Sequence, residues 1–183
     1  MAKESLYDYN LRTHSYNDVW KQISNLIHVH TKTLIINAGI GYLLKYLIDR
    51  DFENVKGINA HPELTLKGIE LCKDLTESLV CENFFRISED NLKDYDCFIF
   101  AKTLEYLEND KQFLKHLPEK SNIILTLPNY DDGLTLKHFS SDKEIRDYFK
   151  DILENIEIYK ICLYKNMEFM IDQAVFVVKG NIK

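Results

Sequence analysis

The order of strand-type and helix-type segments is the feature of this chain that most restricts its fold. Five short strand-type runs are separated by helical segments: "TLIIN" (33–37), "NVKGIN" (54–59), "ESLVCENFF" (77–85), "DCFIFA" (96–101) and "NIILTL" (122–127). This alternation predicts a parallel sheet with helices on both faces. The segment "NIEIYKICLYKNMEFMIDQAVFVVKG" (155–180) is typical of two long strands around a turn at Lys165–Asn166. Because no helix separates these two strands, they should be antiparallel neighbours at one edge.

We therefore expect an α/β protein with a doubly wound, seven-stranded, mostly parallel sheet and an antiparallel C-terminal hairpin. Helices are expected over 19–28, 42–49, 62–75, 103–117 and 140–152. Pro62 suits the first turn of a helix, and a Ser cap with an acidic first turn begins the last one. The length fits a single domain, 1–183, in which 1–30 form a helical lead-in or lid and 31–183 form the core.

Composition restricts the function. A formal net charge of -6 and a pI near 5.5 argue against a nucleic-acid-binding surface. The four cysteines are widely spaced, without a CxxC pair, and we interpret them as reduced packing residues of a cytoplasmic protein. The N-terminus is polar, unlike a signal peptide, and no apolar run approaches the roughly 20 residues that span a bilayer. The sequence thus predicts a soluble cytoplasmic protein.

The first strand is followed by a turn with two glycines, "NAGIGYL" (37–43). Gly39 and Gly41 let the main chain turn tightly and let a ligand approach it without a Cβ in the way. The helix that begins near Tyr42 would face such a ligand with free N–H groups. The alternative is a plain strand-to-helix turn that needs positive φ. A dinucleotide site would need a small residue three positions after Gly41, where Leu44 stands, so NAD is disfavoured.

Several motifs occur together in a family-specific order. They are "NAGIG" after the first strand, "GINAHPE" (57–63) after the second, and "TLEYLENDKQFLKHLPEKSNIILTLPNYDDGLTLKHFSSDKEIRDYF" (103–149). Over roughly 19–178 the chain resembles small class I S-adenosylmethionine (SAM)-dependent methyltransferases. The resemblance implies their Rossmann-like fold with a terminal hairpin, and SAM as the cofactor. Because SAM has no pyrophosphate, it tolerates a bulky Leu44.

Three segments of the chain depart from the family pattern at ligand positions. Motif I usually reads acid-x-G-x-G-x-G, and here Ile35 replaces the acid and Asn37 the first glycine; a shifted frame would put Asn37 at the acid position. Asn59 replaces the acid that accepts both ribose hydroxyls of SAM, and Thr135 replaces a frequent histidine. An amide accepts from only one hydroxyl, at a cost of roughly 1 kcal/mol. On this basis Asn59→Asp should tighten SAM binding.

The resemblance places the adenosine across the carboxyl ends of the first four strands. The glycine turn and Tyr42 would meet the methionine part, Asn59 and Ala60 the ribose, and Ser88 or Glu89 the adenine. The end of the fourth strand would lie beneath the sulfonium and the acceptor. The expected cofactor-binding residues are Asn37, Ala38, Gly39, Gly41, Tyr42, Asn59, Ala60, Ser88, Glu89, Ala101 and Lys102. Lys102 is equally compatible with a surface lysine.

The acceptor side is expected at the rim beside the fifth strand. Asn129, Tyr130 and Asp132 are candidates for hydrogen bonds to the acceptor, and His14 and Tyr16 for a lid over the cofactor. A base for an oxygen acceptor would be Asp131, His138 or Glu105. Each has a plainer interpretation: the Asn- and Asp-rich segment as a turn, His138 as an ordinary surface or core residue, and Glu105 as a solvated acid of a helix's first turn. No metal is required by this chemistry.

The sequence therefore predicts methylation of a small acceptor. O-methylation of a sugar or nucleotide sugar in glycan biosynthesis rests on the resemblance alone. The alternative is a non-catalytic binding or partner protein on the same fold. An NAD-dependent oxidoreductase is disfavoured by Leu44, and RNA methylation by the negative charge. Apolar hairpin residues (Phe169, Met170 and Phe176) would serve a homodimer interface or simply the core.

Overall fold

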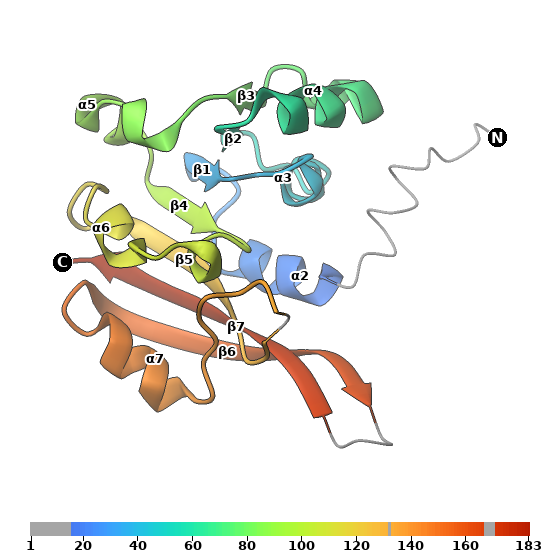
Figure 1. Ribbon diagram of the computed structural model, residues 1–183. Helices are drawn as coiled ribbons and strands as arrows, with labels where there is room; N and C mark the ends of the chain where they lie inside the picture. The colour runs from blue at the N-terminus through green and yellow to red at the C-terminus, as the bar shows by residue number, and fades with distance from the viewer. Residues whose placement is uncertain (1–15, 132, 167–170) are drawn as a thin grey trace.

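The computed structural model describes residues 16–131, 133–166 and 171–183. Its strands form one seven-stranded sheet in the order β3-β2-β1-β4-β5-β7-β6 (Figure 1). The strands are β1 (Thr33–Ile36), β2 (Val55–Asn59), β3 (Leu79–Cys81), β4 (Cys97–Phe100), β5 (Asn122–Pro128), β6 (Leu153–Asn166) and β7 (Ile171–Ile182). The first five strands pair in parallel, whereas β7 is antiparallel to both β5 and β6. The predicted doubly wound sheet with an antiparallel C-terminal hairpin is confirmed.

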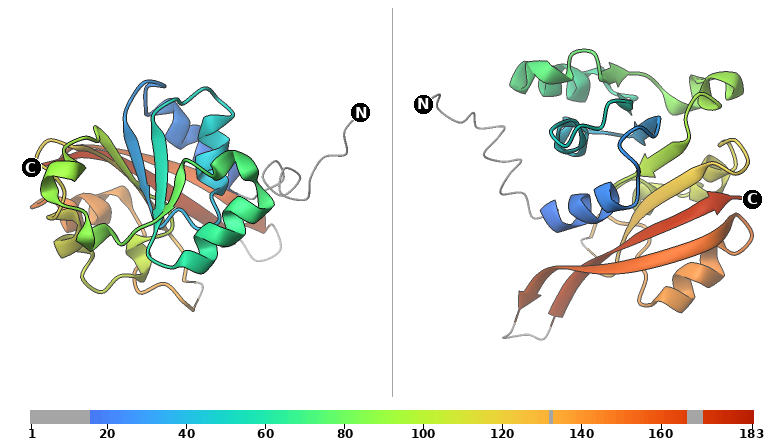
Figure 2. Two further views of the ribbon diagram at one scale, coloured as in Figure 1. Left: turned by 90° about the horizontal axis from the view of Figure 1, so that it is seen from above. Right: turned by 180° about the vertical axis from the view of Figure 1, so that it is seen from behind.

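Helices lie on both faces of this sheet (Figures 1 and 2). They are α2 (Asn17–Asn25), α3 (Tyr42–Ile48), α4 (Pro62–Leu71), α5 (Glu89–Leu92), α6 (Asp110–Leu114) and α7 (Asp142–Phe149), with 3-10 turns η1 (Lys73–Leu75), η2 (Phe84–Arg86) and η3 (Leu104–Tyr106). Ser141 caps α7 by accepting a hydrogen bond from the Glu144 N–H, as its sequence predicts.

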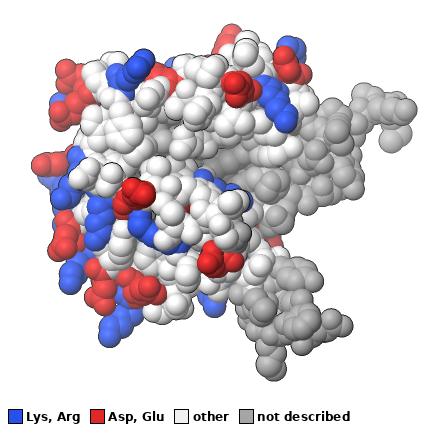
Figure 3. All heavy atoms as spheres, in the orientation of Figure 1, with Lys and Arg blue, Asp and Glu red and all other residues white. Residues whose placement is uncertain are grey.

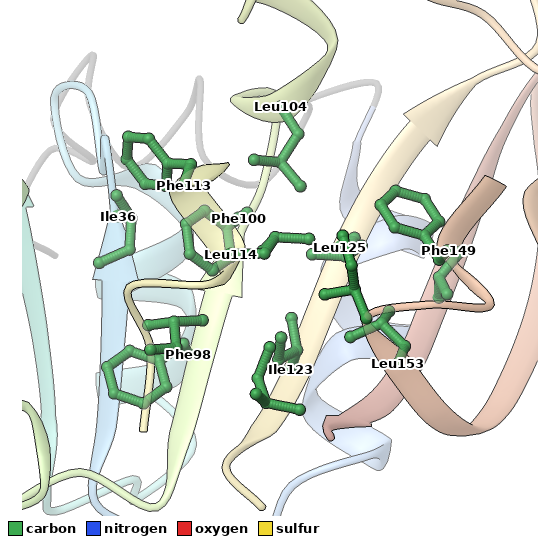
Figure 4. Packing of buried hydrophobic residues seen from close by; sticks show 14 of the residues in the cluster. Ile36, Phe98, Phe100, Leu104, Phe113, Leu114, Ile123, Leu125, Phe149 and Leu153 are labelled. Carbon is green, nitrogen blue, oxygen red and sulfur yellow. The ribbon is translucent and has the colours of Figure 1, made fainter. Parts of the chain in front are cut away.

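Two hydrophobic clusters fill the space between the sheet and its helices. Residues of one strand alternate between them, as the two-residue period of a strand requires: Leu34 and Ile36 face one cluster, and Ile35 faces the other. The first cluster joins β4 and β5 to α6 and α7, and Figure 4 shows Phe98, Phe100 and Phe113 packed in it. The second joins α2 and α3 to the opposite face. Each buried side chain of this size contributes roughly 1.5–3 kcal/mol.

The largest difference from the predicted elements is the helix expected over 103–117, which is broken into η3 and α6. Lys102 takes a left-handed conformation with φ of 54° before this segment, and Asn109 stands at the N-cap position of α6 without a capping hydrogen bond from its side chain. The segment keeps its helical periodicity, but the structure turns between the two halves, before Asp110. The helix from Pro62 ends at Leu71 rather than at 75, and β3 covers only three residues of the run 77–85.

The C-terminal hairpin extends further than expected. Lys165 and Asn166 pair with Asp172 and Ile171, so both belong to β6 and the connection follows them. Of the hairpin residues considered for a dimer interface, Phe169 and Met170 lie outside the described residues. Phe176 is 1% exposed and belongs to the core, so it is not available for contact with a second chain.

The cysteines and the helices bear on two further expectations. All four cysteines are free thiols; Cys72 and Cys97 are buried, as packing residues should be, whereas Cys81 and Cys162 are exposed. Burial raises the pKa of the Cys97 thiol to about 12. In the part of the chain that the structure describes, no helix combines the length and the apolar character that crossing a membrane requires.

Candidate functional site

The turn after β1 adopts a conformation that ordinary side chains disfavour. Asn37, Gly39 and Gly41 all have positive φ, at 55°, 61° and 85°. The Ala38 N–H donates to the Ile58 carbonyl at 3.0 Å, and the Gly41 N–H donates to the Ala38 carbonyl at 3.0 Å. Glycine adopts positive φ without steric cost, and asparagine tolerates it better than most residues. The sequence "NAGIG" is therefore matched to this turn.

Asn59, at the end of β2, holds the same turn through its side chain. Its Oδ1 accepts a hydrogen bond from the Gly39 N–H at 2.8 Å, and its Nδ2 donates to the Gly39 carbonyl at 2.8 Å. Nδ2 also lies 3.1 Å from the Thr65 hydroxyl, to which it donates. The side chain is 2% exposed. The amide thus faces the protein on both of its polar ends, and neither the pairing nor Thr65 is visible in the sequence pattern.

A second turn follows β4 and is fixed by threonines of neighbouring segments. The Lys102 N–H donates to the Thr126 hydroxyl at 2.8 Å, which supports the left-handed φ of 54° at this lysine. The Thr103 hydroxyl lies 3.2 Å from the carbonyls of Ile36 and Ala101. Thr103 and Thr126 are both buried. Two of the five described non-glycine residues with positive φ, Asn37 and Lys102, thus lie at the ends of two adjacent strands; the others are Asp51, Lys120 and Asn155.

The two turns border a cavity of about 270 Å³ at the carboxyl ends of β1 and β4. It is lined by Tyr16, Trp20, Asn37, Ala38, Gly39, Ile40, Tyr42, Leu43, Ala101 and Lys102. Trp20 comes from α2 and packs on Tyr42 and Tyr46, with ring centroids 6.3 and 5.6 Å apart. The Lys102 ammonium lies 5.0 Å from the centroid of the Tyr16 ring. An aromatic wall and one cation therefore face a main-chain turn.

The phenol of Tyr16, in the cavity wall, lies near the Tyr130 hydroxyl and the Glu105 carboxylate. Tyr16 is 5% exposed and Glu105 is 2% exposed. The pKa of Tyr16 is raised, chiefly because its phenol is buried and then because it is hydrogen-bonded to Tyr130 and lies near the Glu105 carboxylate. Glu105 is thus a buried acid beside an aromatic residue of the cavity wall, not the solvated acid that its plainer interpretation describes.

The structure brings together part of the predicted set. Asn37, Ala38, Gly39, Tyr42, Ala101, Lys102 and Tyr16 line the cavity, and Gly41 belongs to its turn. Trp20, which the sequence offers as a lid residue or as a helix anchor, also lines it, as do Ile40 and Leu43, which the sequence pattern alone marks only as turn or helix-packing residues. Ser88 caps α5 by accepting from the Asn91 N–H, and Glu89 lies 3.9 Å from Lys93. Because α5 lies on the side where the parallel strands begin (Figure 1), these two residues are away from the cavity. Ala60 is exposed after β2.

Residues after β5 mainly shape their own segment. Asn129 is tied to β7, because its Oδ1 accepts from the Ala174 N–H at 2.7 Å. Asp131 is exposed and accepts from the Gly133 N–H at 2.7 Å, which is the turn-forming role of its plainer interpretation. His138 is exposed. His14 and Asp132 lie outside the described residues. Of the three candidate bases, only Glu105 is buried beside the cavity wall.

Charge and metal-binding potential can be judged from the surface. Figure 3 shows Lys and Arg interspersed with Asp and Glu on the face that it presents, with no continuous patch of one sign. Within 16–131, 133–166 and 171–183, no three His, Cys, Asp or Glu side chains are arranged to hold a metal ion. A larger cavity, of about 450 Å³, lies near the amino ends of the parallel strands. It is lined by Lys32, Glu53, Asn54, Val55, Lys56, Glu77, Ser78, Asp94 and Tyr95. Neither of the two strained turns contributes to it.

Comparison with known proteins gives the fold a class. No protein-family model matches the sequence. No curated protein matches it either. The strand order and the antiparallel hairpin are those of the class I SAM-dependent methyltransferase fold. Solved structures with this fold include a SAM-dependent methyltransferase from Thermotoga maritima, with 11% identity, a TM-score of 0.65 and coverage of 96% of this chain and 93% of that one.

Two more solved structures extend the likeness. Magnesium protoporphyrin IX methyltransferase from Synechocystis PCC 6803, with bound S-adenosylhomocysteine (SAH), has 10% identity and a TM-score of 0.65, covering 100% of this chain and 90% of that one. A SAM-dependent methyltransferase from Aquifex aeolicus has 17% identity and a TM-score of 0.64, covering 96% of each chain. At such identities the likeness defines the fold, and the activity has to be inferred from the residues of the site.

Proposed function

We propose that this protein is a SAM-dependent methyltransferase that acts on a small acceptor. The observation that carries this proposal is the cavity between the glycine turn after β1 and the strained turn after β4. In an open α/β sheet, ligands bind outside the carboxyl ends of the strands, which is where this cavity lies. The solved structures of the same fold include methyltransferases with bound SAM and SAH.

The residues of the cavity fit the methionine part of SAM. Gly39 leaves open space where a side chain would project, so a ligand can approach its main chain. Lys102 supplies a cation for the methionine carboxylate. The rings of Tyr16, Trp20 and Tyr42 suit the positively charged sulfonium. Bound SAM would supply an electrophilic methyl group, and the protein would align the acceptor and exclude water.

Glu105 is the candidate base that the geometry favours. It is buried beside Tyr16, whereas Asp131 and His138 are exposed. A carboxylate in this place can take the proton of an acceptor hydroxyl that reaches it past Tyr16, whose phenol is hydrogen-bonded to Tyr130. Tyr130 is half-buried at the rim and is the candidate for contact with the acceptor.

Two finer statements belong to this proposal. A sugar or nucleotide sugar is the acceptor class to test first, because of the sequence resemblance. A cytoplasmic location is proposed as well, and the free thiols are consistent with it. A second candidate function is ligand binding without catalysis on the same fold. It is favoured by Asn59, whose amide is engaged with Gly39 and Thr65 where the resembling family has a ribose-binding acid.

The first experiment is calorimetric titration of the full chain with SAM and with SAH. We expect micromolar dissociation constants, followed by transfer of a labelled methyl group to nucleotide sugars. Absence of heat up to millimolar SAM and SAH would overturn the cofactor assignment. Tight binding without transfer to any acceptor class would instead favour the non-catalytic alternative.

The role of Lys102 provides a sharper test with a matched control. Lys102→Ala removes the cation of the cavity, and loss of a charge-assisted hydrogen bond should weaken SAH binding roughly tenfold. Lys56→Ala removes an exposed lysine near the amino ends of the parallel strands and should leave the affinity for SAH unchanged. Equal affinities for the two variants would show that Lys102 does not receive the carboxylate.

A further inference from the structure

We infer that Asn59 is a positioning residue that holds the glycine turn in its ligand-receiving shape, and that an acid at this position would open the turn instead of binding ribose. The inference deepens the proposed function, on which its ligand-binding part rests. It reverses the expectation from the sequence, where Asn59 stood as a weakened ribose acceptor and Asn59→Asp as a gain of affinity.

The geometry of the pairing requires an amide. The Gly39 N–H needs an acceptor and the Gly39 carbonyl needs a donor, and the Asn59 side chain supplies both at 2.8 Å. Rotating the amide by half a turn would set its NH2 against the N–H and its oxygen against the carbonyl. The contact to the Thr65 hydroxyl at 3.1 Å uses the second proton of Nδ2. The amide therefore pairs with the N–H and the carbonyl of Gly39 in the way that the main chain of a neighbouring strand would.

The pairing acts at the point of the turn with the least other support. Ala38 and Gly41 are held by main-chain hydrogen bonds, whereas Gly39 is held across 20 residues of sequence by Asn59. Gly39 has φ of 61° and borders the cavity. Loss of the pairing would free both polar groups of Gly39 in a partly buried place. The cavity wall would then no longer be fixed before a ligand arrives, and a less preorganised site binds more weakly.

A carboxylate cannot replace this amide at neutral pH. In Asn59→Asp, one carboxylate oxygen would still accept from the Gly39 N–H, but the second oxygen would face the Gly39 carbonyl with no proton between them. A buried carboxylate in contact with a carbonyl has a raised pKa, because its neutral form is favoured. On protonation it can donate to the Gly39 carbonyl and restore the pairing. The stability of Asn59→Asp should therefore increase as pH falls, because the folded state binds the proton more tightly than the unfolded state does.

The test compares Asn59→Asp with Asn83→Asp by thermal unfolding at pH 8 and pH 5.5. Asn83 is exposed after β3, and its side chain only accepts a hydrogen bond, from the Phe85 N–H at 3.0 Å, so an aspartate serves equally well there. Relative to Asn83→Asp, we expect Asn59→Asp to unfold about 5–10 °C lower at pH 8 and to recover up to about a third of this deficit at pH 5.5, because the recovery is complete only below the unfolded pKa of an aspartate, about 3.9. A pH-independent deficit, or none, would overturn the inference.

Two further measurements keep the inference testable if Asn59→Asp does not fold at pH 8. The folded fraction seen by circular dichroism should then rise as the pH falls from 8 to 5.5, and a fraction that does not rise counts against the pairing. Thr65→Val removes one partner of the amide and should lower the unfolding temperature by about 2–4 °C, since it leaves one buried N–H unpaired. An unchanged temperature would contradict the role assigned to Thr65.

Titration with SAH separates the inference from the proposed function. At pH 7.5 Asn59→Asp should bind SAH at least about fivefold more weakly than the unmodified protein, because its turn is open. Tighter binding would restore the ribose role and overturn the inference. If the unmodified protein binds neither SAM nor SAH, the proposed function fails, whereas the pH dependence of unfolding still decides whether Asn59 holds the turn.

Discussion

At the scale of single residues, the glycine turn depends on a glycine that lies outside it. A Cβ at Gly57 in β2 would come within 2.6 Å of the Ala38 Cβ and 3.2 Å of a Leu44 methyl group. The absence of a side chain at Gly57 therefore lets the turn rest directly on β2. Leu44, which disfavoured a dinucleotide, is fully buried at this contact. The site is shaped by close packing as much as by hydrogen bonds.

This contact predicts the effect of Gly57→Ala. Overpacking of this kind costs about 1–3 kcal/mol, so we expect a loss near 2 kcal/mol in the free energy of unfolding measured in urea. The double variant Ala38→Gly/Gly57→Ala removes the facing methyl group and should recover part of the loss. Strict additivity of the two single changes would show that the two positions do not clash.

Single residues also show where sequence reasoning about the site ends. Glycine at positions 39 and 41 permits the positive φ that both residues adopt, which the sequence offers as one alternative for this turn. The partners of Asn59 do not follow, because Gly39 lies 20 residues away and only the folded register brings it within 2.8 Å. A position known from family resemblance was therefore assigned the family's role, although its amide already has partners within the protein.

At the scale of elements, α6, α7 and the segment after β5 are joined at one buried carboxylate. Asp110 is 3% exposed and lies 2.9 and 3.0 Å from the Tyr148 hydroxyl of α7. The Lys137 ammonium lies 3.1 Å from the same carboxylate and also donates to the Leu107 carbonyl. Because the Leu136 N–H donates to the Glu105 carbonyl, this segment also rests on η3 beside the candidate base.

Removal of the Tyr148 hydroxyl should loosen this junction. Tyr148→Phe is expected to lower the free energy of unfolding by about 1.5 kcal/mol at pH 8, since the lost hydrogen bond is to a charged group. Tyr159→Phe is the matched control, because that hydroxyl also meets a carboxylate, Glu157, but on the surface. Similar losses in urea unfolding for both variants would contradict the importance of burial at Tyr148.

The stabilisation by the Tyr148 hydroxyl should also depend on pH. Burial and the Asp110 carboxylate raise the pKa of Tyr148 above its ordinary value of 10.0. The stabilisation is therefore complete below pH 10, and it is lost as pH rises further, because the unfolded chain releases the phenol proton first. The difference between the unmodified protein and Tyr148→Phe should be smaller at pH 10.5 than at pH 8.

Elements also differ in how far sequence predicts them. The strands and most helices follow from apolar runs and periodicity, which persist over several residues and tolerate local error. The segment 103–117 has helical periodicity throughout, yet the structure divides it at the turn before Asp110, which it buries against Tyr148. Such a tertiary contact outweighs local propensity, and it involves residues 38 positions apart.

At the scale of the whole molecule, ligand binding should be visible in the stability of the fold. A ligand at 100 times its dissociation constant adds about 2.7 kcal/mol to the free energy of unfolding, which raises the unfolding temperature of a chain of this size by roughly 5–10 °C. We expect this shift with SAH and none with NAD, because Leu44 stands where a dinucleotide site needs a small residue. A larger shift with NAD than with SAH would contradict both the proposed cofactor and the argument from Leu44.

The position of α2 has a consequence for how the molecule is completed during synthesis. Val19 and Ile23 of α2 pack in the same cluster as Val175 and Val177 of β7, and Trp20 of α2 closes one side of the cavity. The apolar face of α2, the first described helix to leave the ribosome, is therefore fully covered only when the last strand is present. Contacts between distant parts of a chain carry a loop-closure entropy cost, which slows folding. A nascent or truncated chain that lacks β7 would therefore lack part of the support of α2, whose Trp20 packs on Tyr42 and Tyr46 of α3 at the cavity wall.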